Sequence, residues 1–367
     1  MAITAAQVKE LREMTGAGMM DCKKALEATE GDMDKAVDFL REKGLASAAK
    51  KASRIAALGL VTTKICPCGK KAVVLEVNSE TDFVAKNEKF RTYVGEVAEQ
   101  ALNSEATDME GFMAEKWNLD ESMTVKEKLS SMIAVIGENM NIRRFEQVSV
   151  EDGAVASYIH AGGNIGVLVA AEGSSDDAAK EALTNVAMQI AAMNPQYISR
   201  SEISDAELAK IREITVESAL NDPASLPKPI LMKLQAQAVE SAWNEEDKAA
   251  FAEQKTNKFW FNFISKEGME ALAALAVASK ADIVSDKIFG GLVDGRIAKQ
   301  LKEICLMDQT YVKAEDGKQT VAQYLQQVAK AAGQDVTVVS FIRYETGEGL
   351  QKKEENFAEE VAKQMQG

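Results

Sequence analysis

The sequence predicts an α+β protein with a three-helix N-terminal domain, two related core subdomains with antiparallel sheets, a long helical insertion and a C-terminal helix. Three observations support this fold class. The first 45 residues contain short capped segments of helical periodicity. A β-branched hairpin followed by a helical segment then occurs twice. A long, mostly helical stretch finally separates the second hairpin from a late β-rich segment, which we interpret as an insertion.

The N-terminal segment is expected to form a small three-helix bundle. Thr4 and Gln7 have the spacing of a capping box at the start of the first helix. The second helix is expected from about residue 19 to residue 29. Asp32 is placed to cap the third helix, and Gly44 is expected to end it. Three helices of this size are marginally stable alone and suit a docking module.

Two hairpin-and-helix units are expected to follow. In the first, VTTKI and KAVVLEV flank the turn CPCGK, and a helix is predicted from Phe83 to Leu102. In the second, VASYI and NIGVLVAA flank an AGG turn, and a helix is predicted over Asp177–Met193. The late stretch VTVVSFIRYE (336–345) supplies a further strand. The pattern therefore predicts two structurally related subdomains, the second of them interrupted.

These patterns define expected boundaries. We predict the N-terminal domain at 1–45, a small, basic linker at 46–57, the first core subdomain at 58–145, the second at 146–197 with 305–350, the helical insertion at 198–304, and a C-terminal helical module at 351–367.

The insertion is rich in aromatic residues, since it holds Trp243 and Trp260 together with four phenylalanines at 251, 259, 261 and 263. These side chains could form a satellite core, which we favour, or an apolar face for a partner. In the C-terminal module, Phe357, Val361 and Met365 recur at helical spacing, which predicts a docking helix over Glu354–Met365.

Composition excludes several classes of function. The formal net charge is 43 − 57 = −14, which argues against broad binding to nucleic acid or anionic membranes. One histidine, His160, cannot supply a multi-histidine metal centre, and four cysteines in 367 residues are no disulfide framework. We expect a protein of a reducing, cytoplasmic compartment, without a membrane-spanning segment or signal peptide.

No residue set predicts catalysis. Cys66 and Cys68 could share a soft metal, but the remaining ligands, Cys22, Cys305 and His160, are scattered. We therefore interpret the pair as incidental cysteines of a hairpin turn. A nucleophilic Cys–His pair using His160 has no local support, and the sequence GxxxxGK[ST] of a phosphate-binding loop is absent. We expect no metal and no cofactor.

The segment SETDFVAKNEKF (79–90) stands out because an acidic and an aromatic residue begin a predicted helix. Ser79 or Thr81 could cap that helix, and Asp82 would complement its positive end. Two interpretations of Phe83 remain open. Its ring could fold back into the core, or it could project as a wedge, since one exposed aromatic side chain can dominate a protein interface.

Five blocks of the sequence carry a resemblance to a known family. They are LREMTGAGMMDCKKALEATEGDMDKAVDFLREKG (11–44), LEVNSETDFVAKNEKF (75–90), IGENMNIRR (136–144), SYIHAGGNIGVLVA (157–170) and FIRYETGEGLQKKEENFAEEVA (341–362). These blocks resemble those of the bacterial elongation factor Ts family, and they occur in the family's order, which makes the resemblance specific. The resemblance implies a ubiquitin-associated-type N-terminal domain and an exchange factor for the GTPase elongation factor Tu, in its GDP-bound and nucleotide-free forms. It implies no enzyme chemistry, no nucleic acid and no membrane.

The resemblance also implies which residues touch the partner. Asp82 and Phe83, with Thr81 and Val84 beside them, match the pair that disturbs the partner's magnesium and phosphate site. The remaining matches are His160, Lys23, Ile136 with Gly137, and, in a weakly similar block, Val312. The C-terminal helix matches a module that touches the GTPase domain, and the insertion offers a route to a homodimer.

Three departures from the family pattern bear on these expectations. Asn164 stands where many members carry arginine, which puts a polar contact in question. Leu58 replaces a commonly acidic residue. Residues 221–280 have no counterpart in shorter members, so they could extend a dimerising hairpin or cover a surface that those members expose.

Overall fold

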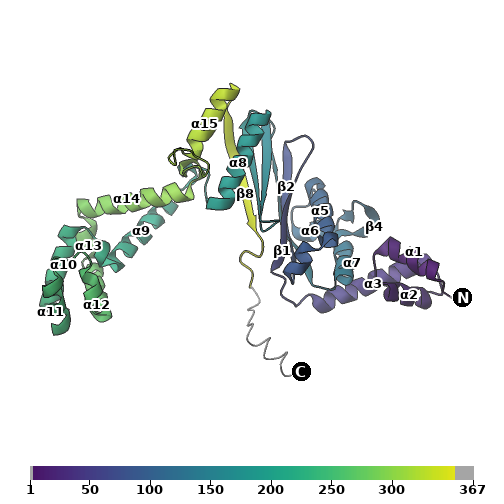
Figure 1. Cartoon of the computed structure of the whole chain (residues 1–367), viewed down its shortest axis with the longest axis horizontal. Helices are drawn as coiled ribbons and strands as arrows, with labels where there is room; N and C mark the ends of the chain where they lie inside the picture. The colour runs from purple at the N-terminus through teal and green to yellow at the C-terminus, as the bar shows by residue number, and fades with distance from the viewer. Residues whose placement is uncertain (1–2, 352–367) are drawn as a thin grey trace. The chain divides into compact units, whose positions relative to one another are not determined.

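The computed structural model describes residues 3–351, and it confirms the predicted α+β class (Figure 1). The chain divides into two compact units. The first unit comprises Met1–Asn194 with Gln323–Gly367, and the second comprises Pro195–Ala322. The predicted C-terminal helix over Glu354–Met365 lies outside the described residues.

The N-terminal bundle consists of α1 (Ala5–Thr15), α2 (Met19–Ala28) and α3 (Met33–Lys51). The predicted capping box of Thr4 and Gln7 is confirmed. The prediction that Gly44 ends the third helix is wrong, because α3 continues for seven residues beyond it. Gly44 is buried where α3 packs on α7, next to the backbone of Ser130, so the glycine lies inside a helix–helix contact and not at a helix end.

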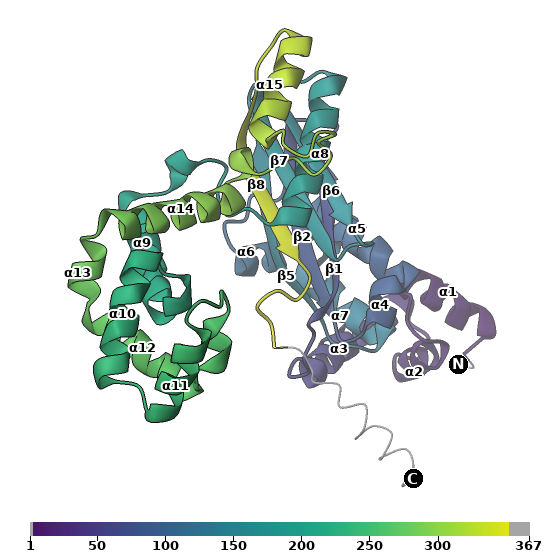
Figure 2. The ribbon, with the colours of Figure 1, turned by 60° about the vertical axis from the view of Figure 1, so that its left-hand side comes forward.

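The rest of the first unit contains two three-stranded antiparallel sheets with helices on their outer faces (Figure 2). Its helices are α4 (Asp82–Lys86), α5 (Glu88–Asn103), α6 (Met109–Ala114), α7 (Val125–Ile136), α8 (Asp177–Met193) and α15 (Val321–Ala332), the last beginning at the unit boundary. Its strands are β1 (Leu58–Ile65), β2 (Lys71–Ser79), β3 (Lys116–Trp117), β4 (Asp120–Thr124), β5 (Met140–Ser149), β6 (Gly153–His160), β7 (Ile165–Gly173) and β8 (Val336–Glu345).

The two sheets have the orders β1-β2-β5 and β6-β7-β8, so each predicted hairpin is confirmed and gains a third strand. Strand β2 is central and buried on both faces. Its residues Val73, Leu75 and Val77 belong to the core beneath α5 and α7, while Ala72 and Val74 belong to the core between the sheets. Because successive side chains of a strand point to opposite faces of the sheet, β2 contributes residues to both cores.

A buried carboxylate links the two sheets. Glu76 of β2 is fully buried, and its oxygens accept hydrogen bonds from Arg143 and Arg144 of β5, at 3.1 and 2.7 Å. The backbone N–H of Gly347, just beyond β8, donates to the same carboxylate at 2.7 Å. The connection joins segments that are 271 residues apart.

The predicted helix Asp177–Met193 is confirmed as α8, which begins at the capping residue Asp176 and ends at Asn194 in the left-handed conformation. It covers the outer face of β6 and β7. The late strand is confirmed as β8, and it pairs with β7. The second sheet is therefore completed by a strand that follows the whole second unit in the sequence.

The second unit is helical and has its own core. Its helices are η1 (Arg200–Glu202), α9 (Asp205–Asn221), η2 (Pro223–Ser225), α10 (Lys228–Ser241), α11 (Glu245–Gln254), η3 (Trp260–Phe263), α12 (Lys266–Ala278), α13 (Lys280–Val284), α14 (Lys287–Ile304) and η4 (Leu306–Asp308). Within residues 3–351, no helix is both long and apolar enough to cross a bilayer.

The favoured interpretation of the aromatic residues, a satellite core, is confirmed for the two tryptophans. Trp243 and Trp260 are buried with Phe251, their rings 5.1 to 6.3 Å apart, and the Trp243 indole N–H donates to the Gly268 carbonyl at 2.8 Å. Phe259 and Phe263 are half exposed, so part of the aromatic content lies on the surface.

Candidate functional site

Phe83 projects from the surface at the start of the five-residue helix α4. Its side chain is 79% exposed, so the interpretation of Phe83 as a core contact is wrong. Thr81 is the N-cap residue, and its hydroxyl accepts a hydrogen bond from the Val84 N–H. Val84 is only 7% exposed and lies in the core with Leu60 and Phe90, so it anchors α4 and has no free surface for a partner. Helix α4 is thus anchored in the core through Val84 and exposes the ring of Phe83 to solvent.

The single helix predicted from Phe83 to Leu102 is in fact two helices. Asn87 ends α4, with its N–H donating to the Val84 carbonyl, and it begins α5, with its side chain accepting from the Lys89 N–H. Asparagine offers this local side-chain bond in place of the helical one, which explains the break. The break leaves the residues before Asn87 as a separate short helix.

Glu138 braces the start of α4 from a neighbouring loop. Its carboxylate accepts from the Thr81 N–H at 3.0 Å and from the Thr81 hydroxyl at 2.7 Å. Ile136 ends α7 and packs against the core, and Gly137 caps that helix in the left-handed conformation at φ 91°. The structure thus brings the predicted Ile136–Gly137 pair beside Thr81. Glu138 was missed by the sequence analysis, although it follows Gly137 directly in the block IGENMNIRR.

Asp82 is exposed beside Phe83 and pairs with Lys86, one helical turn further on, at 2.6 Å. The hydrogen bond from the Lys86 ammonium group lowers the pKa of the Asp82 carboxyl below its ordinary value. The carboxylate is therefore charged at neutral pH and lies next to the exposed ring. A partner that approaches Phe83 meets a negative charge as well.

His160 is exposed at the end of β6, where the turn to β7 begins. The Arg91 guanidinium of α5 donates to the Gly162 carbonyl of this turn at 2.8 Å, which ties the turn to the helix that follows α4. Gly163 has φ 114°, and a β-carbon there would lie 2.7 Å from the Leu60 side chain, so the turn requires glycine. Arg91 was also missed, since a single arginine on a helix gives no sequence signal. Asn164, where many members of the resembled family carry arginine, is exposed in this turn.

The two other predicted residues lie elsewhere. Lys23 is exposed on α2 of the N-terminal bundle and pairs with Glu27 at 3.7 Å. Val312 is half exposed and belongs to the second unit. Leu58, at the start of β1, is partly exposed, and its carbonyl accepts from the Asn78 side chain. Three segments of the first unit, linked by the bonds of Glu138 to Thr81 and of Arg91 to Gly162, carry the other predicted residues. These residues are Thr81, Asp82, Phe83, Ile136, Gly137 and the His160 turn, and we name them the Phe83 surface.

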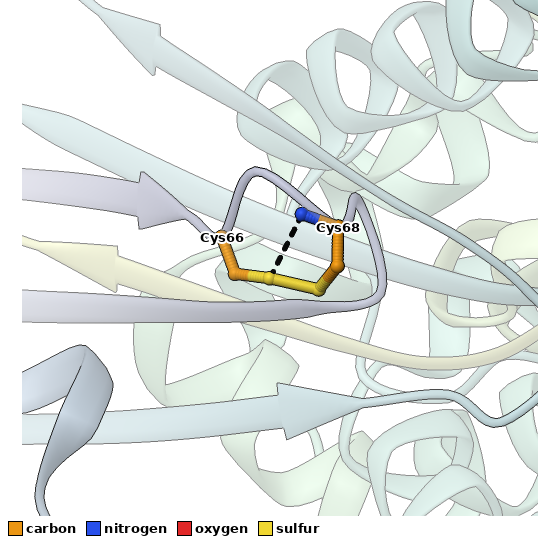
Figure 3. Close-up of a disulfide and its surroundings, with 2 residues drawn as sticks. All are labelled: Cys66 and Cys68. Carbon is orange, nitrogen blue, oxygen red and sulfur yellow. Dashed lines mark hydrogen bonds between the residues drawn. A yellow bond between two sulfur atoms is a disulfide. The ribbon is translucent and has the colours of Figure 1, made fainter.

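The interpretation of Cys66 and Cys68 as incidental thiols is wrong, because their sulfur atoms form a disulfide (Figure 3). The pair lies in the β1–β2 turn, where a single intervening residue, Pro67, leaves the two sulfur atoms within bonding reach. A nucleophilic pair of His160 with Cys66 or Cys68 is also excluded. Val155 of β6 bonds to this turn, and five strand residues of about 3.3 Å each place His160 roughly 16 Å further along. In the described part of the chain, no three His, Cys, Asp or Glu side chains gather as a metal site.

The fold and the site define an α+β protein that offers a braced, exposed aromatic side chain on its surface. Comparison with known proteins identifies its class. The sequence model of elongation factor TS matches residues 80–348. Elongation factor Ts of Clostridium novyi (strain NT) is 44% identical over 365 residues, covering 99% of both chains. Elongation factor Ts of Clostridium perfringens (strain 13) is 45% identical over 363 residues, covering 98% of both.

The chain therefore belongs to the elongation factor Ts family. Elongation factor Ts of Clostridioides difficile (strain 630), 44% identical over 364 residues and covering 99% of both chains, supports the same assignment. Membership confirms the resemblance seen in the five sequence blocks. It makes the protein a factor of translation elongation with a role in nucleotide exchange.

Proposed function

We propose that the protein accelerates the release of GDP from elongation factor Tu by pressing Asp82 and Phe83 into the partner's GTPase domain. The single observation that carries this proposal is the exposure of Phe83, 79% of its side chain, on a helix whose other side is anchored in the core. Water solvates a phenyl ring poorly, so its burial in a partner is favourable. Family membership supplies the partner class.

The physical basis is differential binding. A GTPase holds its nucleotide through backbone N–H groups, a lysine and a magnesium ion. A protein that binds better when this site is distorted must weaken GDP binding by the same factor as GDP weakens its own binding. Each tenfold loosening needs about 1.4 kcal/mol, and one anchoring aromatic side chain supplies about 2 kcal/mol or more.

The contacts that hold α4 in place reduce the entropic cost of binding. Glu138 fixes Thr81, and Val84 fixes the buried side of the helix, so little side-chain or backbone ordering remains to be done on binding. His160, Ile136 and Gly137 are proposed as further contacts on the Phe83 surface. Lys23 from the N-terminal bundle and Val312 from the second unit are proposed as separate contacts. Bond chemistry by this chain is not required in this mechanism, and no metal or cofactor is invoked.

The decisive experiment measures dissociation of a fluorescent GDP analogue from elongation factor Tu, with and without the full chain. We expect the wild-type chain to accelerate release. The acceleration produced by the Phe83→Ala variant should be at least about tenfold smaller. Phe259→Ala is the matched control, because this phenylalanine is also exposed, at 54%, but belongs to the second unit.

Thermal unfolding of both variants separates binding from folding. Because Phe83 is exposed, its replacement should leave the unfolding temperature almost unchanged. Absence of any acceleration by the wild-type chain at micromolar concentration would refute the proposed function. An equal loss from Phe259→Ala would refute the assignment of the Phe83 surface.

A further inference from the structure

The Cys66–Cys68 disulfide lies in the turn between β1 and β2 (Figure 3). The Phe83 surface begins beyond the other end of this hairpin, where Leu58 pairs with Ser79. We propose that it is a reversible site of thiol–disulfide exchange with small thiols, and that its reduction loosens the hydrogen bonds between this turn and the connection from β5 to β6. Four features of the described residues support the proposal, and none of them depends on the proposed function.

The first feature is the size of the closed loop. The two cysteines are separated by two positions, so the bond closes a very short loop. In the chain-entropy account, a disulfide stabilises a fold less as the loop that it closes becomes shorter. The bond therefore contributes little to folding compared with one that joins distant segments.

The second feature is the difference in exposure between the two sulfur-bearing residues. Cys68 is exposed, whereas Cys66 is half buried and packs against the core beneath α5 and α7. An incoming thiolate has access to the Cys68 sulfur, and attack there expels Cys66 as the leaving thiolate. The Cys68 N–H donates to the Cys66 sulfur at 3.0 Å, a bond that also stabilises the charge of the leaving group.

The exchange is balanced with a small thiol as the reductant. A first thiolate forms a mixed disulfide with Cys68, and the electron pair of the broken S–S bond passes to Cys66, which takes a proton from solvent. A second thiolate attacks the sulfur of the small thiol in the mixed disulfide and releases Cys68. The protein gains two electrons and two protons, and two small thiols become one disulfide.

The third feature is the connection of the turn to its surroundings. The Gly69 carbonyl accepts from the Val155 N–H at 3.0 Å, and the Lys70 carbonyl accepts from the Val150 N–H at 2.9 Å. The Lys70 ammonium donates to the Glu151 carbonyl at 2.6 Å. The turn that the disulfide closes thus holds the segment that leads from the first sheet into the second.

The fourth feature is the contrast with the other two cysteines. Cys22 and Cys305 are fully buried, and burial raises the pKa of both thiols. Buried thiols of raised pKa react slowly. They serve as internal references in the native chain.

The test uses the full chain in glutathione buffers of graded ratio at neutral pH. The native chain is alkylated rapidly with excess reagent in the absence of denaturant, and the products are mapped by peptide mass. We expect the peptide that holds both Cys66 and Cys68 to pass from oxidised to reduced as the ratio rises, while Cys22 and Cys305 stay unlabelled until denaturant is added. A peptide that remains oxidised in every buffer, or free thiols in every buffer, would overturn the proposal.

A matched pair of variants tests the direction of attack. In Cys66→Ser the remaining Cys68 should form a mixed disulfide with oxidised glutathione at least about tenfold faster than Cys66 does in Cys68→Ser. Equal rates would overturn the assignment of Cys68 as the attacked sulfur. Circular dichroism of both variants verifies that the fold is retained.

Hydrogen exchange tests the coupling to the β5–β6 connection. Reduction of the wild-type chain should speed exchange at the Val150 and Val155 amides, which bond to the turn, and leave the Leu75 amide in the middle of β2 unchanged. Unchanged exchange at Val150 and Val155 would overturn the coupling.

Discussion

At the scale of single residues, the buried Glu76 carboxylate collects four hydrogen-bond donors from three segments. Burial by itself raises the pKa of such a carboxyl. The Gly347 N–H, the Asn78 amide and the Arg144 guanidinium outweigh burial, so the pKa lies below its ordinary value of 4.5. Since the unfolded chain then binds the proton more tightly, the carboxylate stabilises the fold above pH 4.5 and loses this contribution as the pH falls towards its folded pKa.

We predict that Glu76→Gln lowers the free energy of unfolding by about 3 kcal/mol at neutral pH, because both arginines lose a buried counter-charge. The difference from wild type should shrink below pH 4.5, where the wild-type carboxylate also becomes protonated. Urea unfolding at a series of pH values measures both effects.

The matched control for this variant is Glu348→Gln. Glu348 also pairs with Arg144, at 3.3 Å, but its side chain is half exposed, and exposed ion pairs contribute less than about 1 kcal/mol. If Glu76→Gln lowered the free energy of unfolding by no more than Glu348→Gln does, the account of the buried charge would be contradicted.

At the scale of elements, helix α3 shows that a residue which often ends helices can serve packing instead. Gly44 faces α7, and a β-carbon at this position would lie 3.5 Å from the Ser130 carbonyl oxygen, an ordinary contact distance. There is room for a methyl group at the contact. A branched side chain would have to displace the backbone of α7.

We predict that Gly44→Ala raises the free energy of unfolding of the first unit by about 0.5–1 kcal/mol, because alanine restricts the unfolded chain more than glycine does. Gly44→Leu should lower it by about 1–3 kcal/mol through overpacking. Chemical denaturation followed by far-ultraviolet circular dichroism distinguishes the two. If Gly44→Ala destabilised the protein as much as Gly44→Leu, the packing account would be wrong.

Helices α3, α4 and α8 show which structural features can be predicted from sequence patterns and which cannot. Helix α8 was predictable because Asp176 caps its start and apolar residues recur at helical spacing. The prediction from Gly44 was wrong because a glycine within a helix that packs on another helix looks the same in sequence as one that ends a helix. The exposure of Phe83 could not be derived, since it depends on Asn87 breaking the helix and on Glu138, 57 residues away from Thr81, bracing it. Contacts between distant segments leave no periodic signal.

At the scale of the whole molecule, the second unit has the properties of an independently folding domain. Its core includes Trp243, Phe251 and Trp260 and is built from residues of this unit alone. The unit has 128 residues, from Pro195 to Ala322, a size at which a single core supports cooperative folding.

We predict that residues 195–322, produced alone, fold into a helical domain that unfolds in one cooperative transition. Tryptophan fluorescence and circular dichroism should report coincident midpoints, because both tryptophans lie in the shared core. Trp243→Phe, which removes the indole N–H bonded to Gly268, should lower the midpoint. A fragment without a cooperative transition would show that the unit depends on the rest of the chain.

The pairing of β7 with β8 has a consequence for synthesis on the ribosome. Strand β7 is complete at Gly173, but its partner β8 begins only at Val336, after the whole second unit has been translated. Domains fold as they emerge, so the second unit can form while β7 still has an open, apolar edge. The nascent chain must therefore keep an unpaired strand from associating with other chains until the last strand arrives. A pause in translation before residue 336 would lengthen that period of exposure.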